Sequence, residues 1–407
     1  MKKVYIQTFG CQMNTADSAE MMLALAARGC ILCGSQEEAD IVLINTCTIR
    51  EHAEHKSLSL LGRLRRWKNE KPNRIIIYTG CAAQRLGKTV QKKFPYVDIV
   101  SGAKEIDKFD EVLTSSGLFG AKASAGTLKE NSPIALVNIM RGCSCKCSYC
   151  IVPYVRGEAV SLPFEEVLSN INTKLENGAK EIVLLGQTVN AYNYKGKTFA
   201  DLLRQALKLN GLDRLRYLSP HPLFITPEVA DIMATEDKMS KHLHLPMQSG
   251  SSKVLKEMKR GYTREDFISK IKLLKQGGIW VSTDIIVGYP TETEEDFSQT
   301  LSIVEECTFS GAYCFKFSPR FGTPAFSLKQ LPLNLVEKRL DILLNKVKEQ
   351  AKAAYKAQQG TCQRVLMETP FNGRTMSNFW VKTAAPHKVG EIIETVVKQA
   401  QDSILLA

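Results

Sequence analysis

The stretch Arg141-Gly-Cys-Ser-Cys-Lys-Cys-Ser-Tyr-Cys150 places Cys143, Cys147 and Cys150 at the spacing Cys-x3-Cys-x2-Cys. It directly follows the β-rich run 134–140, so we expect it to form a loop at the carboxyl end of a strand. Three thiolates on one tight loop can hold three irons of a 4Fe-4S cluster, whose usual ligand set is four cysteines. The remaining iron is then open to an external ligand, which is typical of a catalytic metal site.

Cys145 leaves a second interpretation of this loop open. Together with Cys143, Cys147 and Cys150 it supplies four thiols. Four cysteines are also a ligand set of structural zinc. On spacing alone, the loop therefore predicts either an open iron-sulfur cluster or a zinc knuckle.

The region around this loop predicts an α/β fold. Each of six β-rich runs is followed by a helical pattern, and these runs span residues 134–140, 181–185, 215–219, 242–245, 280–287 and 312–317. Strands that alternate with helices imply parallel strands joined by crossover helices. Six units are too few for a closed eight-stranded barrel, so we predict a partial (β/α)6 barrel with its chemistry at the carboxyl ends of the strands.

Breaks in periodicity on either side predict the domain boundaries. Small, polar and breaker residues fill 117–133, and helical spacing runs from Leu335 to Gln359, with Asn334 and Glu337 as a capping box and Gly360 as a stop. The tail is β-branched, with Asn372-Gly373 as a hairpin turn. We predict an N-terminal open parallel α/β domain (1–118), a linker (119–133), the barrel domain (134–360) and a short β domain (361–407).

A second cysteine set is predicted from position rather than spacing. Cys11, Cys47 and Cys81 each follow a β-rich run, at residues 4–9, 41–45 and 75–79. If these strands are parallel neighbours, their carboxyl ends lie along one edge at about 4.7–4.9 Å spacing. Ligands of open α/β sheets bind at that edge, so the three thiols predict a second cluster. The alternative is three buried cysteines that act as small hydrophobic residues.

Composition and charge limit the class of protein. The 407 residues are 44% hydrophobic and 24% charged, as in ordinary globular proteins. The apolar runs fall short of the roughly 20 residues that cross a bilayer, and the amino terminus does not resemble a signal peptide. We therefore expect a cytosolic chain with reduced thiols. The net charge of +12 favours a polyanionic partner such as RNA.

Two segments concentrate the positive charge. Residues 50–74 and 253–275 each carry eight basic and three acidic residues, and we expect both segments to face the phosphates of a folded RNA. In the first segment we predict that Arg63, Arg65, Arg66 and Trp67 contact RNA; a solvated helix face is the alternative. The six histidines (His52, His55, His221, His242, His244 and His387) show no metal-ligand pattern, and we interpret them as structural or RNA-facing.

The cysteine loop has the form Cys-x3-Cys-x-aromatic-Cys, with Tyr149 as the aromatic residue, and in this it resembles the radical S-adenosylmethionine enzymes. The two cysteine sets narrow the resemblance to the methylthiotransferases, and its motifs cover nearly the whole chain. They are Phe9-Gly-Cys-Gln-Met-Asn14, Asn45-Thr-Cys-Thr-Ile-Arg-Glu51, Gly80-Cys81, Tyr149-Cys-Ile-Val-Pro-Tyr-Val-Arg-Gly157, Leu184-Leu-Gly-Gln-Thr-Val-Asn-Ala-Tyr192 and Leu243-His-Leu-Pro-Met-Gln-Ser-Gly250. Cys145 and a C-terminal domain shorter than the usual RNA-binding TRAM domain depart from the pattern.

This resemblance implies a radical enzyme that adds a methylthio group to carbon 2 of isopentenylated adenosine next to the tRNA anticodon. It implies two 4Fe-4S clusters, one on Cys143, Cys147 and Cys150, the other on Cys11, Cys47 and Cys81. It further implies two S-adenosylmethionines per turnover, with tRNA, an external electron donor and a sulfur source as partners.

Two later strand ends are candidates for contacts of S-adenosylmethionine: Gly186 and Gly288 permit close backbone approach, and the amide of Gln187 can donate and accept hydrogen bonds. An ordinary turn is the alternative for each glycine, and Tyr149 of the cysteine loop is the fourth predicted contact. Methylthiotransferases that act on threonylcarbamoyl-adenosine or on a ribosomal protein are the nearest alternatives. A non-catalytic, zinc-containing RNA-binding protein is the distant one.

Overall fold

The computed structural model describes residues 1–48, 51–122 and 132–407. Most of the predicted linker, and Arg50 of the first basic segment, lie outside the described residues. The chain divides into two compact units. The first comprises residues 1–130, 141–144 and 151–158, and the second comprises 131–140, 145–150 and 159–407. The domain boundaries predicted at 118, 133 and 360 stay predictions.

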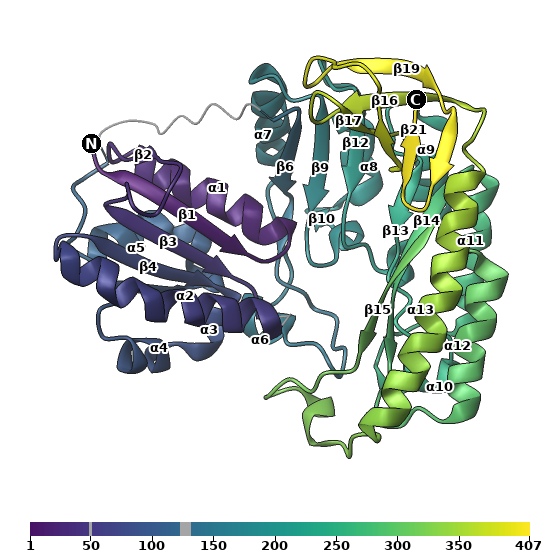
Figure 1. The fold of residues 1–407 in the computed structure, drawn as a ribbon, viewed down its shortest axis with the longest axis horizontal. Helices are drawn as coiled ribbons and strands as arrows, with labels where there is room; N and C mark the ends of the chain where they lie inside the picture. Colours follow the sequence, from purple (N-terminus) through teal and green to yellow (C-terminus); the bar gives the residue numbers. More distant parts are fainter. Residues whose placement is uncertain (49–50, 123–131) are drawn as a thin grey trace. The chain divides into compact units, whose positions relative to one another are not determined.

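The first unit is built on a five-stranded sheet with the order β2-β1-β3-β4-β5 (Figure 1). All its strand pairs are parallel, which confirms the predicted open α/β sheet. Both β3 and β4 are buried along their whole length, as expected for parallel strands covered on both faces. The strands are β1 (Lys3–Phe9), β2 (Ile31–Leu32), β3 (Ile41–Thr46), β4 (Ile75–Gly80) and β5 (Ile99–Gly102).

Helices accompany this sheet along the chain. They are α1 (Gln12–Ala26), α2 (Glu51–Glu70), α3 (Cys81–Leu86), α4 (Lys88–Lys93), η1 (Ala103–Lys108), α5 (Phe109–Ser115) and α6 (Val152–Arg156). One large apolar cluster joins α2 to the sheet through Leu61 and Leu64, and a second joins α1 and α5 to it through Leu25 and Leu113. A smaller cluster lies beyond the carboxyl ends of β4 and β5, where Cys81 packs with Ala103, Ile106, Ile151 and Val155.

The second unit contains the predicted partial barrel. Its strands form two three-stranded sheets, β12-β9-β6 and β13-β14-β15, and every pair is parallel. A parallel bridge pairs Leu215 of the first of these sheets with Met239, three residues before the first residue of the second. The strands are β6 (Ile134–Asn138), β9 (Glu181–Leu185), β12 (Arg214–Tyr217), β13 (His242–His244), β14 (Trp280–Val287) and β15 (Gly311–Lys316). All six predicted strands are confirmed to within two residues at either end.

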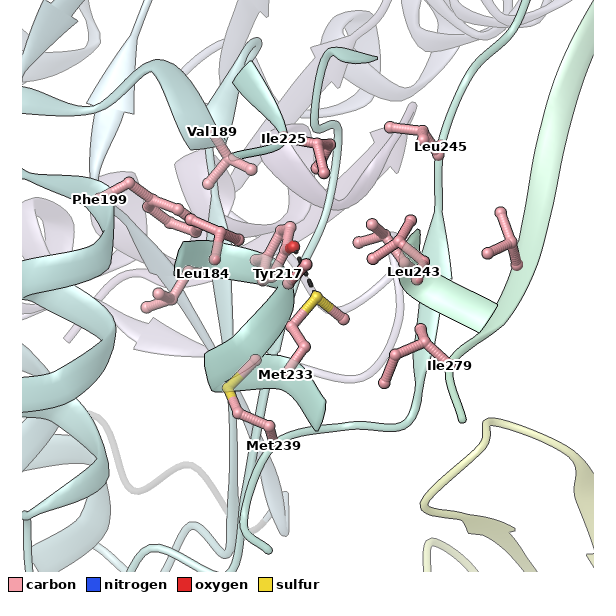
Figure 2. Close-up of a cluster of buried hydrophobic side chains, with 14 of the residues drawn as sticks. Leu184, Val189, Phe199, Tyr217, Ile225, Met233, Met239, Leu243, Leu245 and Ile279 are labelled. Carbon is pink, nitrogen blue, oxygen red and sulfur yellow. Dashed lines mark hydrogen bonds between the residues drawn. The ribbon is translucent and has the colours of Figure 1, made fainter. Parts of the chain in front are cut away.

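Crossover helices pack on the outside of these strands. Burial alternates along β14, whose buried residues include Val281 and Ile285. Figure 2 shows part of the core, where the Tyr217 hydroxyl donates to Met233 Sδ at 2.9 Å. The helices are α7 (Phe164–Glu176), α8 (Phe199–Leu207), α9 (Pro227–Thr235), α10 (Ser252–Glu257), α11 (Arg264–Gln276) and α12 (Glu294–Cys307); α8, α11 and α12 begin with capping boxes. Short strands β7 (Met140–Arg141), β8 (Val160–Ser161), β10 (Asn193–Tyr194) and β11 (Lys197–Thr198), with 3₁₀ turns η2 (Val189–Ala191), η3 (Pro222–Phe224) and η4 (Pro324–Ser327), complete this part.

Two local predictions about the C-terminal part are wrong. The long helix α13 (Leu333–Lys356) begins after Pro332 without a side-chain cap, so Asn334 and Glu337 form no capping box. Asn372 and Gly373 lie inside a strand, and the turn falls one to three residues earlier, over 369–371. A Cβ on Gly373 would lie 2.4 Å from the Leu366 carbonyl oxygen, so this glycine permits close strand approach instead.

The tail forms a predominantly antiparallel sheet, as predicted, with the order β19-β16-β17-β18-β21-β20. It is bonded to the amino ends of the barrel strands, where Arg214 Nη1 donates to the Thr375 carbonyl at 2.8 Å. Its strands are β16 (Cys362–Met367), β17 (Asn372–Thr375), β18 (Trp380–Lys382), β19 (Ile392–Val396), β20 (Gln399–Gln401) and β21 (Ile404–Leu406). Among the described helices, none combines the length and apolar character that a bilayer span requires.

Candidate functional site

The three N-terminal cysteines follow three adjacent strands at the same level of the sheet. In the register of the sheet, Phe9 is paired with Thr46 and Thr46 with Gly80. Cys47 and Cys81 come directly after Thr46 and Gly80, and Cys11 is one residue further beyond Phe9. The Cys47 amide donates to the Phe9 carbonyl at 2.7 Å. The structure thus brings the backbones of the predicted set to one sheet edge.

Polar residues next to these cysteines fix the edge. Asn14 Nδ2 donates to Asn45 Oδ1 at 3.0 Å, and Asn45 Nδ2 donates to the Asn14 carbonyl at 2.7 Å. Gly80 has φ +93°, and a Cβ there would lie 2.3 Å from Asn45 Oδ1. Only glycine combines this backbone conformation with this closeness. Local residue choices around the cysteines therefore serve the convergence of the three strand ends.

A buried arginine lies against one of the three thiols. Arg156 Nε donates to Cys81 Sγ at 3.1 Å, and its Nη2 donates to Asp17 Oδ2 at 2.8 Å. Asp17 is fully buried and also accepts from Arg141 Nη1 at 2.7 Å. Burial raises the pKa of the Cys81 thiol to about 12, while the Arg156 cation opposes the shift. A bound metal would supply the further positive charge that stabilises a thiolate here.

The centre of the other cysteine loop is anchored by Ser148. Its hydroxyl donates to the Glu257 carbonyl and bonds to the Tyr289 hydroxyl, both at 2.9 Å. Its amide donates to the Met258 carbonyl, and its own carbonyl accepts from Ala325. This part of the loop is thereby held against the carboxyl ends of α10 and β14, which is the predicted end of the barrel.

Cys147 also accepts a hydrogen bond from a buried arginine. Arg260 Nη1 donates to Cys147 Sγ at 3.4 Å, and its Nε donates to the Tyr262 hydroxyl at 3.1 Å. Arg260 belongs to the second basic segment, but only 7% of it is exposed. The prediction that this segment faces RNA is therefore wrong for Arg260, because its charge is directed at a thiol.

The other cysteines of the loop have separate surroundings, and the Cys150 amide donates to the Cys147 carbonyl at 3.2 Å. Cys143 is buried and its amide donates to the Gly157 carbonyl at 3.0 Å, within the first unit. Cys145 Sγ lies 3.9 Å from the Thr188 hydroxyl in the second unit. The His, Cys, Asp and Glu side chains of 1–48, 51–122 and 132–407 include no group of three arranged around a single metal ion. Both the zinc and the iron-sulfur interpretations require such a group, so this finding does not distinguish between them.

The predicted cofactor contacts have mixed surroundings. A Cβ on Gly186 would lie 2.5 Å from Met140 Cγ, and one on Gly288 would lie 2.6 Å from Val336, so neither position has space for a side chain. Tyr149 packs beside a buried apolar cluster that includes Met258. The amide of Gln187 differs, because both its side-chain nitrogen and oxygen are buried and find no hydrogen-bond partner in the described part of the chain.

The predicted RNA contacts on α2 divide into two groups. Arg63, Arg65 and Arg66 are exposed and border a shallow surface hollow. Trp67 is buried, and its indole N–H donates to the Gln36 carbonyl at 2.9 Å. Because Trp67 packs in the core of the first unit, its prediction as an RNA contact is wrong.

Comparison with known proteins identifies the family. The Uncharacterized protein family UPF0004 model matches residues 3–102, and the Radical SAM superfamily model matches residues 137–304. A protein of Polynucleobacter necessarius subsp. necessarius named tRNA-2-methylthio-N(6)-dimethylallyladenosine synthase is 40% identical, across 99% of this chain and 95% of its own. The chain belongs to this synthase family. Another member, from Chromobacterium violaceum, is also 40% identical, across 98% of this chain and 97% of its own.

Solved structures with low sequence identity share the fold of the family. The radical S-adenosylmethionine methyltransferase TsrM from Kitasatospora setae aligns with a TM-score of 0.61 at 14% identity, covering 80% of this chain and 77% of that one. The cobalamin-dependent S-adenosylmethionine radical enzyme OxsB aligns with a TM-score of 0.54 at 13% identity, covering 86% of this chain and 56% of that one. The radical S-adenosylmethionine fold is thereby confirmed.

Membership of the radical S-adenosylmethionine superfamily implies a 4Fe-4S cluster and S-adenosylmethionine. The residues present fit both groups: the thiol of Cys147 lies beside a buried cation, and the Gln187 amide is buried without a partner. The sequence had not singled out Arg156, Asp17 or Arg260, because their partners are far away along the chain.

Proposed function

We propose that this chain is a tRNA methylthiotransferase that adds a methylthio group to carbon 2 of isopentenylated adenosine next to the anticodon. The observation that carries the proposal is the convergence of Cys11, Cys47 and Cys81 at one sheet edge, with Arg156 on Cys81. The radical fold alone fits many reactions, whereas a second cysteine set suits the delivery of sulfur. The names of the nearly full-length relatives agree with this substrate.

The chemistry of the substrate explains the need for a radical. Carbon 2 of adenine carries an unactivated hydrogen, which general acid–base catalysis, typically worth about 10²–10⁴-fold, does not remove. Reductive cleavage of bound S-adenosylmethionine supplies a radical that can abstract it. In this proposal Cys143, Cys147 and Cys150 hold the cluster for that step, and Arg260 fixes Cys147 in place.

The second cysteine set has a different role in the proposal. Cys11, Cys47 and Cys81 hold a second 4Fe-4S cluster on which the sulfur is carried. Arg156 stabilises the Cys81 thiolate, and Asp17 orients Arg156. Two S-adenosylmethionines are used per turnover, one for the methyl group and one for the radical.

The proposed contacts outside the cysteine sets follow from exposure and charge. Gln187 binds S-adenosylmethionine through its unpartnered amide, together with Tyr149, Gly186 and Gly288. Arg63, Arg65 and Arg66 bind tRNA phosphates, and the tail sheet adds a TRAM-like contact. An electron donor and a sulfur source act from outside. The division into domains 1–118, 134–360 and 361–407 is part of this proposal.

The test is an anaerobic assay of the reconstituted full chain with isopentenylated and unmodified tRNA. We expect 2-methylthio product from the isopentenylated tRNA alone. The triple variant Cys11→Ala, Cys47→Ala, Cys81→Ala should make none, whereas a control that replaces Cys33, Cys314 and Cys362 should retain it. A wild-type chain that binds stoichiometric zinc without iron, or that modifies a ribosomal protein and no tRNA, would overturn the proposal.

A further inference from the structure

His221 follows strand β12 at the end of the barrel that holds the cysteine loop. Its backbone is clamped by Asn190, since the His221 amide donates to Asn190 Oδ1 at 2.8 Å and Asn190 Nδ2 donates to the His221 carbonyl at 3.0 Å. Asn190 lies in the turn that follows β9. The two strand ends are therefore tied together, and the position of the imidazole is fixed by its backbone.

The structure also fixes which ring nitrogen of His221 carries the proton. Nδ1 accepts a hydrogen bond from the Leu223 amide at 3.2 Å, so in the neutral ring the hydrogen is on Nε2. Burial lowers the pKa of His221 to about 3, and the Arg260 cation acts in the same direction. The ring is thus a neutral donor at physiological pH.

The Nε2 donor has no hydrogen-bond partner within 1–48, 51–122 and 132–407, although it is buried and His221 is only 5% exposed. Buried polar groups are nearly always paired, so an unpaired donor needs an explanation. A ligand that supplies an acceptor would satisfy it. The same holds for the Gln187 amide, which lies at the end of the neighbouring strand β9.

The surroundings connect His221 to the cysteine loop. Its ring packs edge-on against Tyr262, with 5.6 Å between ring centroids. The Tyr262 hydroxyl accepts from Arg260, which in turn donates to Cys147 Sγ. Two residues beyond His221, Leu223 is 51% exposed. A buried donor and an exposed apolar side chain thus lie together near the radical site.

We propose that His221 Nε2–H donates a hydrogen bond to a ring nitrogen of the target adenine, and that Leu223 contacts its isopentenyl group. This inference rests on the proposed function. Carbon 2 of adenine lies between two acceptor nitrogens, so one hydrogen bond from a rigid donor can position the carbon that reacts. The adenine of S-adenosylmethionine offers the same acceptors, but Leu223 matches only the isopentenylated base.

The experiment uses the reconstituted full chain and isopentenylated tRNA with deuterium at carbon 2 of the target adenine. His221→Ala should lower 2-methylthio formation about 10- to 100-fold, which corresponds to the loss of one buried hydrogen bond. It should also lower the fraction of 5′-deoxyadenosine that carries deuterium. His221→Gln keeps an N–H donor and should restore much of that fraction. His387→Ala, in the tail, is the matched control.

Two binding measurements complete the test. S-adenosylmethionine affinity should stay within about twofold in the His221 variants. Leu223→Ala, at an exposed site that does not threaten folding, should reduce the preference for isopentenylated over unmodified anticodon stem-loop about 5- to 50-fold. Unchanged deuterium transfer in His221→Ala, or weakened S-adenosylmethionine binding with deuterium transfer intact, would overturn the inference. Failure of the wild-type chain to make any methylthio product would instead overturn the proposed function.

Discussion

Cys143, Cys147 and Cys150 lie on one loop, whereas Cys11, Cys47 and Cys81 follow three different strands of the first unit. The spacing of Cys143, Cys147 and Cys150 along the chain is sufficient to indicate a metal site. The other set is assembled only when β1, β3 and β4 are paired in register. Its geometry therefore depends on the whole sheet, and any change that shifts one strand displaces one thiol from the other two.

The electrostatic surroundings of the two sets show a common feature and a difference. In each set one thiol accepts from a buried arginine, Arg156 on Cys81 and Arg260 on Cys147. Arg156 is oriented by the buried carboxylate of Asp17, whereas Arg260 bonds to a tyrosine hydroxyl and a backbone carbonyl. The set of Cys11, Cys47 and Cys81 therefore depends on the buried ion pair of Arg156 and Asp17, and removing either partner destabilises such a pair.

The largest expected effect separates the two sets by function. The wild-type chain should hold about eight irons after anaerobic reconstitution, and either triple cysteine-to-alanine variant about four. Replacing Cys11, Cys47 and Cys81 should leave reductive formation of 5′-deoxyadenosine but abolish methylthio product, whereas replacing Cys143, Cys147 and Cys150 should abolish both. Chromatography of one anaerobic reaction measures both products. Methylthio product from the N-terminal triple variant with added sulfide would show that those cysteines are structural.

The sequence predicted regular and local features well. Parallel strands and the strand-end positions of Cys11, Cys47 and Cys81 follow from hydrophobic runs and chain order. The roles of Arg156 and Arg260 could not be predicted from the sequence, because each donates to a thiol that is distant in the chain. A basic residue is also usually expected in solvent. The same applies to Trp67, whose place among basic residues predicts an RNA contact, because its burial in the core depends on how α2 packs on the sheet.

A second prediction uses the metal-free chain and compares thiols within the chain. Because burial raises the pKa of Cys81 to about 12, the neutral thiol is favoured in the folded state and little thiolate is available at pH 8. Alkylation of Cys81 by iodoacetamide should be at least about 100-fold slower than that of exposed Cys362. The stability contributed by this neutral thiol is present below the unfolded pKa and is lost as pH rises towards 12. Equal alkylation rates, followed by peptide mass spectrometry, would contradict the buried position.

A third prediction tests the buried ion pair of Arg156 and Asp17 beside Cys81. Arg156→Ala removes the donor to Cys81 and one of the two arginines that pair with Asp17. Breaking a buried pair costs about 3–5 kcal/mol, and since Arg141 remains we expect about 2–4 kcal/mol of lost unfolding free energy. Urea denaturation measures it. Arg66→Ala, which breaks only an exposed pair with Glu70, should cost less than about 0.5 kcal/mol.

The smallest effect concerns which unit contacts the tRNA phosphates. The logarithm of tRNA affinity should fall with the logarithm of salt concentration, by about 0.7 to 0.9 per neutralised phosphate. Replacing exposed Arg63, Arg65 and Arg66 of the first unit by alanine should flatten this slope by the amount expected for the loss of about two to three phosphate contacts. Replacing exposed Lys256, Lys259 and Lys272 of the second unit provides the matched comparison. If the slope is unchanged in the arginine triple variant and flatter in the lysine triple variant, the phosphate contacts belong to the second unit. The α2 arginines are then a solvated helix face.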